Sequence, residues 1–281
     1  MTNSFLLTIR HRIALLSLIA ALMLLAGALT QARASEPCRS TLDTVRSYGV
    51  LIAGLLTQNV PYGYLNVSGA NTGFDADMAK DSAKRPDVRG ELRRITAAPR
   101  IPLPVSGSSD VAIAATAIAR KRGEAVDFTW PYGTEGGKIP IQRGEKFAGL
   151  TGPDRQIVVF PQGLSCFSDI VKAHPAIKAP ALPAPATACL ALLQGMAAAT
   201  VLNATPPYRP GQGNPKVEIL AVEAWEPKAP ALAIRQDDPR WRSALNYALN
   251  DLRRIGTDRS LHQKNCGQLP DPRFSANPYG I

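Results

Sequence analysis

Short apolar segments alternate with helical segments along this chain, and this alternation constrains its fold more than any other feature. Apolar runs of strand length occur at residues 50–55, 111–115, 157–160 and 231–235. Helical spacing of apolar residues occurs around them, at residues 74–84, 164–173, 186–197 and 239–255. The last of these is the most regular, because one helical face holds Trp241, Leu245, Leu249 and Leu252. Strands that alternate with helices predict an α/β fold with mostly parallel sheets.

Two prolines disturb the segment at residues 101–105, where the alternation of elements predicts a helix. Pro102 and Pro104 carry no backbone N–H, and a proline ring inside a helix clashes with the preceding turn. The prolines therefore argue against a helix here. Arg100 directly precedes the segment, and we expect this arginine to lie on the surface.

The N-terminal 34 residues have the three-part organisation of a secretory signal peptide. Basic residues at positions 10–12 precede an apolar run at residues 13–29, and the small-x-small pattern of Ala32, Arg33 and Ala34 follows. We expect cleavage after Ala34, with an uncleaved membrane anchor as the alternative. No second apolar run of membrane length follows in the sequence, so we expect the remainder to be a soluble protein of the periplasm.

The charge balance of the chain is basic but dispersed. The chain has 32 Lys and Arg against 22 Asp and Glu. Three of the arginines lie within the first 34 residues, which contain no acid, so the exported part carries 29 minus 22, or +7. Clusters such as Arg93-Arg94 and Arg253-Arg254 are short, which is typical of a solvated surface. We therefore expect no nucleic-acid partner.

All four cysteines lie beyond the predicted cleavage site, at positions 38, 166, 189 and 266. An even number of cysteines in an oxidising compartment favours disulfides, and four cysteines allow three pairings. A metal site is the weaker interpretation, because no CxxC motif is present and only His174 and His262 follow the cleavage site. No GxSxG motif occurs either, and we expect no cofactor.

Four segments, in this order along the chain, carry a family resemblance: TLDTVRSYGVLIAGL, PYGYLNVSGANTGFDADMAK, RIPLPVSGSSDVAIAATAIARKRGEAVDFTWPY and PALAIRQDDPRWRSALNYALNDLRRIGT. Together they resemble the periplasmic amino-acid-binding proteins of ABC importers, the polar amino-acid group of bacterial extracellular solute-binding proteins. The resemblance extends over residues 41–267 and is weakest at 180–215. It implies the type II periplasmic-binding-protein fold, in which two α/β lobes close over a ligand by hinge motion.

The resemblance also implies where the lobes lie in the sequence. The expected ranges are 36–133 with 228–270 for lobe one, 137–225 for lobe two and 271–281 for a loose tail. The chain would cross between the lobes twice, at residues 133–138 and 223–229. These lobes favour one disulfide within each of them, Cys166–Cys189 in lobe two and Cys38–Cys266 in lobe one.

The stretch IARKRGEAVDFTWPY at residues 118–132 contains the position most directly linked to a ligand. In the family that the chain resembles, an arginine shortly after a buried strand grips the α-carboxylate of the bound amino acid, and Arg122 matches this arginine. Arginine suits the role because its planar guanidinium meets a carboxylate with two parallel hydrogen bonds. We expect the neighbouring Lys121 to point away from the ligand.

Other ligand-contacting positions of the family are changed in this chain. Asn203 and Gln58 stand where the resemblance implies acids, the first of them an aspartate that pairs with the ammonium of the ligand. Ala117 replaces a threonine that helps to bind the carboxylate. In the loop PQGLSC, Leu164 replaces a hydroxyl residue, whereas Ser165 keeps one.

These changes suggest which ligands the protein prefers. A hydrogen bond to a charged group contributes about 1.5–3 kcal/mol and a neutral one about 0.5–1.5 kcal/mol, so amides in place of carboxylates weaken the preference for an ammonium. We hypothesise a ligand that is net anionic, or whose amine is absent or blocked. The alternative is that Asp169 or Glu226 supplies the missing acid. The resemblance also places Tyr62 against the ligand side chain, and we assign Asp75 to the beginning of a helix with no ligand role.

The resemblance implies a binding protein that captures a small anionic or zwitterionic solute, an amino acid or a related organic acid, and delivers it to the membrane permease of an ABC importer. We expect a monomer. One alternative is an enzyme, because periplasmic relatives with this fold act as dehydratases on prephenate or arogenate. That reaction needs a general acid near Arg122, and the nearby acids stand in no convincing motif: Glu135, Glu223 and Glu226. A sensory or accessory module with a degenerate site is the other alternative.

Overall fold

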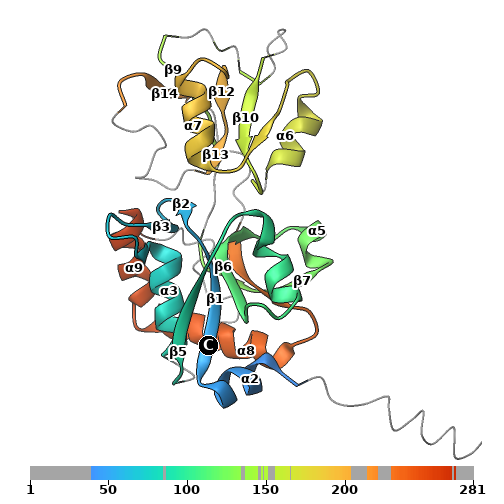
Figure 1. Ribbon diagram of the computed structural model, residues 1–281, viewed down its shortest axis with the longest axis vertical. Helices are drawn as coiled ribbons and strands as arrows, with labels where there is room; N and C mark the ends of the chain where they lie inside the picture. Colours follow the sequence, from blue (N-terminus) through green and yellow to red (C-terminus); the bar gives the residue numbers. More distant parts are fainter. Residues whose placement is uncertain are drawn as a thin grey trace, which may run out of the picture. The chain divides into compact units, whose positions relative to one another are not determined.

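The computed structural model describes residues 39–84, 87–133, 137–144, 147, 149–150, 156–164, 166–203, 214–220, 229–267 and 269. Residues 41–281 belong to one structural unit, which contains two five-stranded sheets (Figure 1). Within the described ranges, no helix has the length and apolar character needed to cross a bilayer. The predicted signal peptide and C-terminal tail lie outside the described residues, as do Cys38, Glu135, Ser165, Glu223 and Glu226.

The first sheet has the strand order β5 (Arg89–Ile95), β1 (Val50–Leu56), β6 (Val111–Ala117), β15 (Pro230–Arg235) and β7 (Val126–Pro131). β1 runs parallel to β5 and β6, whereas β15 runs antiparallel to β6 and β7. A small three-stranded sheet follows β1, formed by β2 (Gln58–Asn59), β3 (Gly63–Leu65) and β4 (Asn71–Thr72). The longer helices that belong with the first sheet are α2 (Thr41–Tyr48), α3 (Phe74–Ala83), α8 (Pro239–Arg254) and α9 (Thr257–Cys266).

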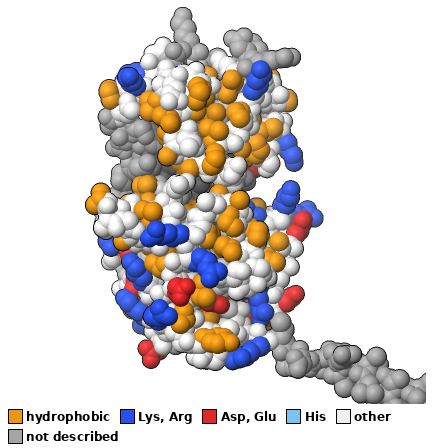
Figure 2. Space-filling model, viewed as in Figure 1, with side chains coloured by type: hydrophobic (Ala, Val, Ile, Leu, Met, Phe, Trp, Pro, Cys, Tyr) orange, Lys and Arg blue, Asp and Glu red, His pale blue; other side chains and the backbone are white. Residues whose placement is uncertain are grey.

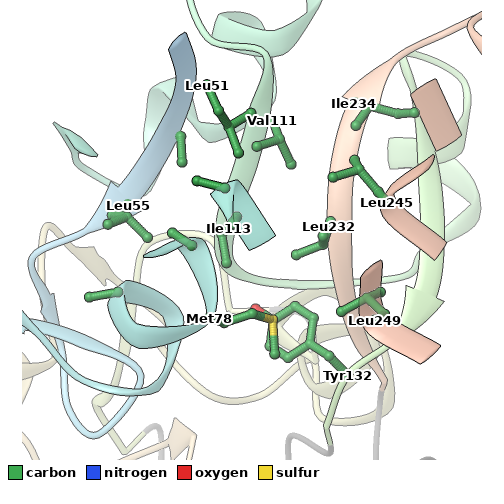
Figure 3. Close-up of a cluster of buried hydrophobic side chains, with 14 of the residues drawn as sticks. Leu51, Leu55, Met78, Val111, Ile113, Tyr132, Leu232, Ile234, Leu245 and Leu249 are labelled. Carbon is green, nitrogen blue, oxygen red and sulfur yellow. The ribbon is translucent and has the colours of Figure 1, made fainter. Parts of the chain in front are cut away.

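The core of the first sheet forms where its central strands meet α3 and α8 (Figure 3). Alternate residues of each strand point to the same face, which explains why the strand residues of this one cluster are two positions apart. The strand residues of this cluster include Leu51, Leu55, Val111, Ile113, Leu232 and Ile234. Met78 comes from α3, and Leu245 and Leu249 come from α8. Each such side chain contributes about 1.5–3 kcal/mol when fully buried.

The second sheet has the strand order β11 (Ala181–Leu182), β10 (Val158–Pro161), β12 (Ala199–Thr200), β9 (Pro140–Gln142) and β14 (Val217–Ile219). β10 runs parallel to β11 and β12, and β9 runs antiparallel to β12 and β14. Its helices are α6 (Phe167–Ala173) and α7 (Pro185–Leu193), and a separate two-stranded pair joins β8 (Gly137–Lys138) to β13 (Leu202–Asn203). The predicted α/β fold is confirmed; in each sheet two parallel pairs lie on one side and two antiparallel pairs on the other.

The chain passes between the two sheets twice. It leaves the first sheet after β7 and returns from β14 to β15. The crossings proposed from the sequence at residues 133–138 and 223–229 stay predictions, because parts of both lie outside the described residues. The lobe boundaries proposed from the sequence place each sheet in one lobe.

The segment with Pro102 and Pro104 is helical, contrary to the expectation from its prolines. It forms the short helix α4 (Pro102–Val105), preceded by the 3-10 turn η1 (Ala98–Arg100). Pro102 occupies the first helical position, where a backbone N–H would have no intrahelical partner and the fixed φ of proline suits the helix. A proline is tolerated in this helix because it lies in the first turn.

The expected disulfide between Cys166 and Cys189 is not formed, because the second sheet separates the two residues. Cys166 packs with Val158 and Phe160 of β10, whereas Cys189 packs with Val159 of the same strand. Neighbouring residues of a strand point to opposite faces, so the two sulfur atoms lie on opposite sides of the sheet. The other expected pair cannot be followed, since Cys38 lies outside the described residues; Cys266 is fully buried at the end of α9.

Candidate functional site

A cavity of about 780 Å³ lies beyond the carboxyl ends of β1 and β10, where residues from both sheets face each other. Ligands of open α/β sheets bind at this end of the strands. The loop from β1 into β2, the end of η1, the end of β10 and helix α7 form its walls. Most of the large lining side chains are apolar, namely Leu56, Ile95, Leu164, Leu190, Leu193 and Leu202. The cavity therefore offers a largely apolar container for a small molecule.

Among the described residues that line this cavity, Arg100 is the one cationic side chain, although its position in the sequence predicted a surface location. Its side chain is almost fully buried, at 6% exposure. Nη1 donates to the carbonyls of Ala114 and Ala115, at 3.3 and 3.5 Å, and Nη2 donates to the carbonyl of Gly163. The surface expectation is wrong because η1 turns the chain after β5 so that Arg100 faces the end of β6.

Arg122 lies on the short helix α5 (Arg120–Gly123), directly after β6, and is half-buried. Its Nη1 donates to the carbonyl of Ala117 at 2.8 Å, and its Nη2 donates to the carbonyl of Gly163 at 3.0 Å. Arg122 is not among the described residues that line the cavity, but it shares the Gly163 carbonyl with Arg100, which does line it. The arginine predicted from the sequence therefore lies at the margin of the cavity.

The two guanidinium groups bring two positive charges to one point. Because Arg100 and Arg122 donate to the same oxygen, their Nη2 atoms lie within two hydrogen-bond lengths of each other. Like charges at this separation repel, and an anion between them would be attracted by both. Among the described residues that line the cavity there is no Asp or Glu. Figure 2 shows Lys and Arg side chains at several separate places on the face in view.

The remaining predicted site residues take different places. Gln58 lines the cavity and is exposed. Ala117 is fully buried and contributes its backbone carbonyl to Arg122. Asn203 ends β13, and its side chain is not among those described. Tyr62 is 1% exposed and packs edge-on against Phe74 in the core of the first sheet, so its ring is not one of the described cavity walls.

A buried polar ring behind Arg100 was not anticipated from the sequence. Asp75, Tyr132 and Ala115 form it, and all three are nearly inaccessible to solvent. Asp75 was expected only to begin a helix, yet its carboxylate accepts hydrogen bonds from the Ala115 N–H and the Tyr132 hydroxyl. Nothing in the local sequence signals this ring, because its members come from α3, β6 and the residue after β7.

Two cysteines among the described residues lie near the cavity or the polar ring. Cys189 lines the cavity from α7, and its burial raises the pKa of its thiol. Cys266 is fully buried, and desolvation together with the nearby Asp75 carboxylate raises its pKa to about 12. Both cysteines are therefore held as protonated, weakly nucleophilic thiols at neutral pH. No group of His, Cys, Asp and Glu with metal-binding geometry occurs among the described residues.

Comparisons with known proteins converge on one family. The model of the bacterial extracellular solute-binding proteins, family 3, matches residues 51–268. The ABC transporter glutamine-binding protein GlnH of Bacillus subtilis is 31% identical over 144 residues, which are 48% of this chain and 52% of that protein. The glutamate/aspartate import solute-binding protein of Escherichia coli is 28% identical over 50% of this chain and 49% of its own length. The chain thus spans about half the length of the curated relatives it matches.

Solved structures show the same fold over most of the chain. The ancestral amino acid-binding protein AncCDT-1, a precursor of cyclohexadienyl dehydratase, aligns with a TM-score of 0.73 at 26% identity, covering 81% of this chain and all of that one.

Proposed function

Because the chain belongs to family 3 of the bacterial extracellular solute-binding proteins, we propose that it captures a small carboxylate-bearing solute outside the cytoplasm and delivers it to the permease of an ABC importer. The names of two relatives, a glutamine-binding and a glutamate/aspartate import protein, support an amino acid or a related organic acid as the ligand. The predicted signal peptide agrees with an exported protein. A monomer remains the expected state.

The convergence of Arg100 and Arg122 on the Gly163 carbonyl is the observation that carries this proposal. A ligand carboxylate would accept the hydrogen bonds that Arg100 and Arg122 now donate to the Gly163 carbonyl. Arg122 would hold the carboxylate by two parallel hydrogen bonds, as a planar guanidinium favours. Arg100, whose side chain lines the cavity, would meet a second oxygen-bearing group further along the ligand.

The charge of the cavity favours a net anionic ligand. Arg100 lines the cavity and Arg122 lies at its margin, and no carboxylate occurs among the described lining residues to pair with an ammonium. An ammonium buried without an anionic partner is costly, whereas each hydrogen bond between a guanidinium and a carboxylate contributes about 1.5–3 kcal/mol. We therefore propose a dicarboxylic acid, or an acid whose amine is absent or blocked. The apolar walls would hold the carbon skeleton of the ligand.

Ligand binding would also favour closure. Arg100 and Arg122 belong to the first sheet and its helices, whereas Gly163 follows β10 of the second sheet. A ligand that contacts both sets of residues binds the closed form more tightly than the open one and shifts the population toward it. The two passages of the chain between the sheets are the places where a hinge would act.

A dehydratase is the second candidate, because one structural neighbour is a precursor of cyclohexadienyl dehydratase. Such an enzyme needs a general acid within reach of the substrate. The described lining residues offer only Tyr64 and Cys189 as titratable neutral groups, and burial raises the pKa of the latter. This composition favours binding over catalysis. Incubation with prephenate, followed by the absorbance of phenylpyruvate, separates the two candidates.

Calorimetric titration with a panel of small ligands tests the proposed ligand class. We expect glutarate or another dicarboxylate to bind more tightly than butyrate, and glutamine to bind more weakly than its deaminated analogue. At a hundredfold excess over the dissociation constant, such a ligand should stabilise the protein by about 2.7 kcal/mol, which a melting experiment detects. Tight binding of lysine or arginine would contradict the proposed anionic ligand.

A further inference from the structure

Three hydrogen bonds close the buried polar ring of Asp75, Tyr132 and Ala115. The Ala115 N–H donates to Asp75 Oδ2 at 3.1 Å and to the Tyr132 hydroxyl at 3.0 Å. The Tyr132 hydroxyl in turn donates to Asp75 Oδ1 at 3.1 Å. The carboxyl group of Asp75 is fully buried, so loss of these hydrogen bonds would leave buried polar atoms without these partners, which is costly. The ring therefore holds the backbone of β6 firmly at Ala115.

Ala115 has a backbone conformation that strands do not normally contain. Its φ is +44°, in the left-handed region that residues with a Cβ atom rarely adopt. The pairing of β6 with β15 also shifts register here, between Ala231 and Ala233. Such a bulge redirects backbone groups away from the ladder and persists only where surrounding contacts hold it. The polar ring supplies those contacts.

The redirected carbonyls orient Arg100. At the irregularity in β6, the carbonyls of Ala114 and Ala115 accept from Nη1 of Arg100 instead of continuing a regular ladder. The other terminal nitrogen of the guanidinium reaches Gly163, beside the cavity. The orientation of this cation therefore depends on the conformation of a residue that lies behind it and does not line the cavity.

We propose that Asp75 and Tyr132 are positioning residues for Arg100. By holding Ala115 in the left-handed conformation, they aim two carbonyls that set the direction of the guanidinium, and through it the preference for a ligand with a second anionic group. The preference for such a ligand rests on the proposed function, whereas the orientation of Arg100 does not.

Both positioning residues are themselves anchored. The Asp75 N–H donates to the carbonyl of Tyr62 at 2.7 Å, at the beginning of α3. Gly73 allows this approach, because its φ is +107° and a Cβ atom there would overlap the carbonyls of Pro61 and Tyr62. The Tyr132 N–H donates to the carbonyl of Pro230 at 2.9 Å. The ring thus connects α3, β6 and β15 to one cation.

Chemical modification of Arg100 tests the positioning step without any ligand. Phenylglyoxal reacts with accessible guanidinium groups, and mass spectrometry reports the rate at each arginine. We expect Tyr132→Phe and Asp75→Asn to raise the modification rate of Arg100 several-fold, because its carbonyl acceptors lose their fixed direction. The exposed Arg46 is the internal reference and should keep its rate. Leu245→Ala, which destabilises the same core without touching the ring, controls for a general loss of stability.

Ligand selectivity tests the second step. In both ring variants the ratio of the affinities for glutarate and butyrate should fall about tenfold, since a displaced guanidinium loses its contact with the second carboxylate. Leu245→Ala should leave this ratio unchanged. An unaltered modification rate of Arg100 in both ring variants would overturn the positioning proposal. If that rate rises but the wild-type protein does not prefer glutarate to butyrate, the positioning step stands and the proposed ligand class fails.

Discussion

The two sides of the cavity contribute different chemistry. The side that belongs to the first sheet supplies the two guanidinium groups, the redirected carbonyls of β6 and the buried polar ring behind them. The side that belongs to the second sheet supplies one backbone carbonyl, that of Gly163, and the mostly apolar face of α7. Positive charge is thus concentrated on one side, and apolar surface on the other.

This difference has a physical reason. A guanidinium is held in a fixed direction only when neighbouring groups restrain it, and the long central strands of the first sheet provide such groups. The side that belongs to the second sheet needs only to approach the two arginines closely, and a glycine, which has no side chain, allows its carbonyl to do so. Gly163 has φ +75°, and a Cβ atom there would overlap Nη2 of Arg100. The closest approach of the two sides therefore depends on one residue that has no side chain.

Replacement of Arg122 should have the largest effect on binding. In Arg122→Gln the affinity for glutarate should fall about 100-fold or more, because hydrogen bonds of about 1.5–3 kcal/mol each to a charged group are lost and 1.4 kcal/mol corresponds to tenfold. Calorimetry measures the change. Arg120→Gln, on the exposed part of the same helix, is the matched control. If Arg122→Gln and Arg120→Gln bind glutarate with equal affinity, Arg122 is not the group that binds the carboxylate of the ligand.

Replacement of Gly163 by alanine should have an intermediate effect on binding, because it changes the side of the cavity that belongs to the second sheet. Gly163→Ala should lower stability by about 1 kcal/mol through its left-handed backbone and lower glutarate affinity by pushing Arg100 aside. Gly144→Ala is the matched control, because Gly144 has φ +85° but nothing within 4 Å of a Cβ atom. Both variants should lose stability in a melting experiment, and only Gly163→Ala should lose affinity. A loss of affinity in both would trace the effect to backbone strain.

The smallest predicted effect is a pH dependence of stability from His262. Burial lowers the pKa of this histidine below its usual 6.5, while its hydrogen bond to the Tyr132 carbonyl, at 3.2 Å, and Asp258 oppose the shift. The imidazole donates to that carbonyl through Nε2, and its buried Nδ1 has no hydrogen-bond partner within the described structure. The unfolded chain therefore binds the proton more readily, and stability is lost as the pH falls through 6.5.

Melting temperatures at pH 7.5 and 5.5 measure this effect. His262→Gln keeps a donor for Tyr132 but cannot titrate, so the difference between the two temperatures should shrink. His174→Gln replaces the histidine that follows α6 and should preserve the wild-type difference. If His262→Gln keeps the full difference, the acid sensitivity arises from other groups.

The sequence predicted those elements around the cavity that depend on local patterns. Arg122 follows the buried strand β6, which lies where the apolar pattern predicted a strand, whereas the short helix α5 that carries Arg122 was not predicted. Arg100 was misplaced because its environment comes from Gly163, which is 63 positions away in the chain. Tyr62 was expected at the ligand, but its ring fills a gap beside Phe74 that no local pattern reveals.

The sequence by itself determined the α/β class, the amphipathic helix α8 and the family, because each depends on spacing within one segment or on segments in order. Only the tertiary structure decided that Cys166 and Cys189 face opposite sides of a sheet, that Ala115 adopts a left-handed conformation and that two arginines share one carbonyl. These features arise where segments distant in sequence pack together, and such contacts leave no periodic trace in either segment.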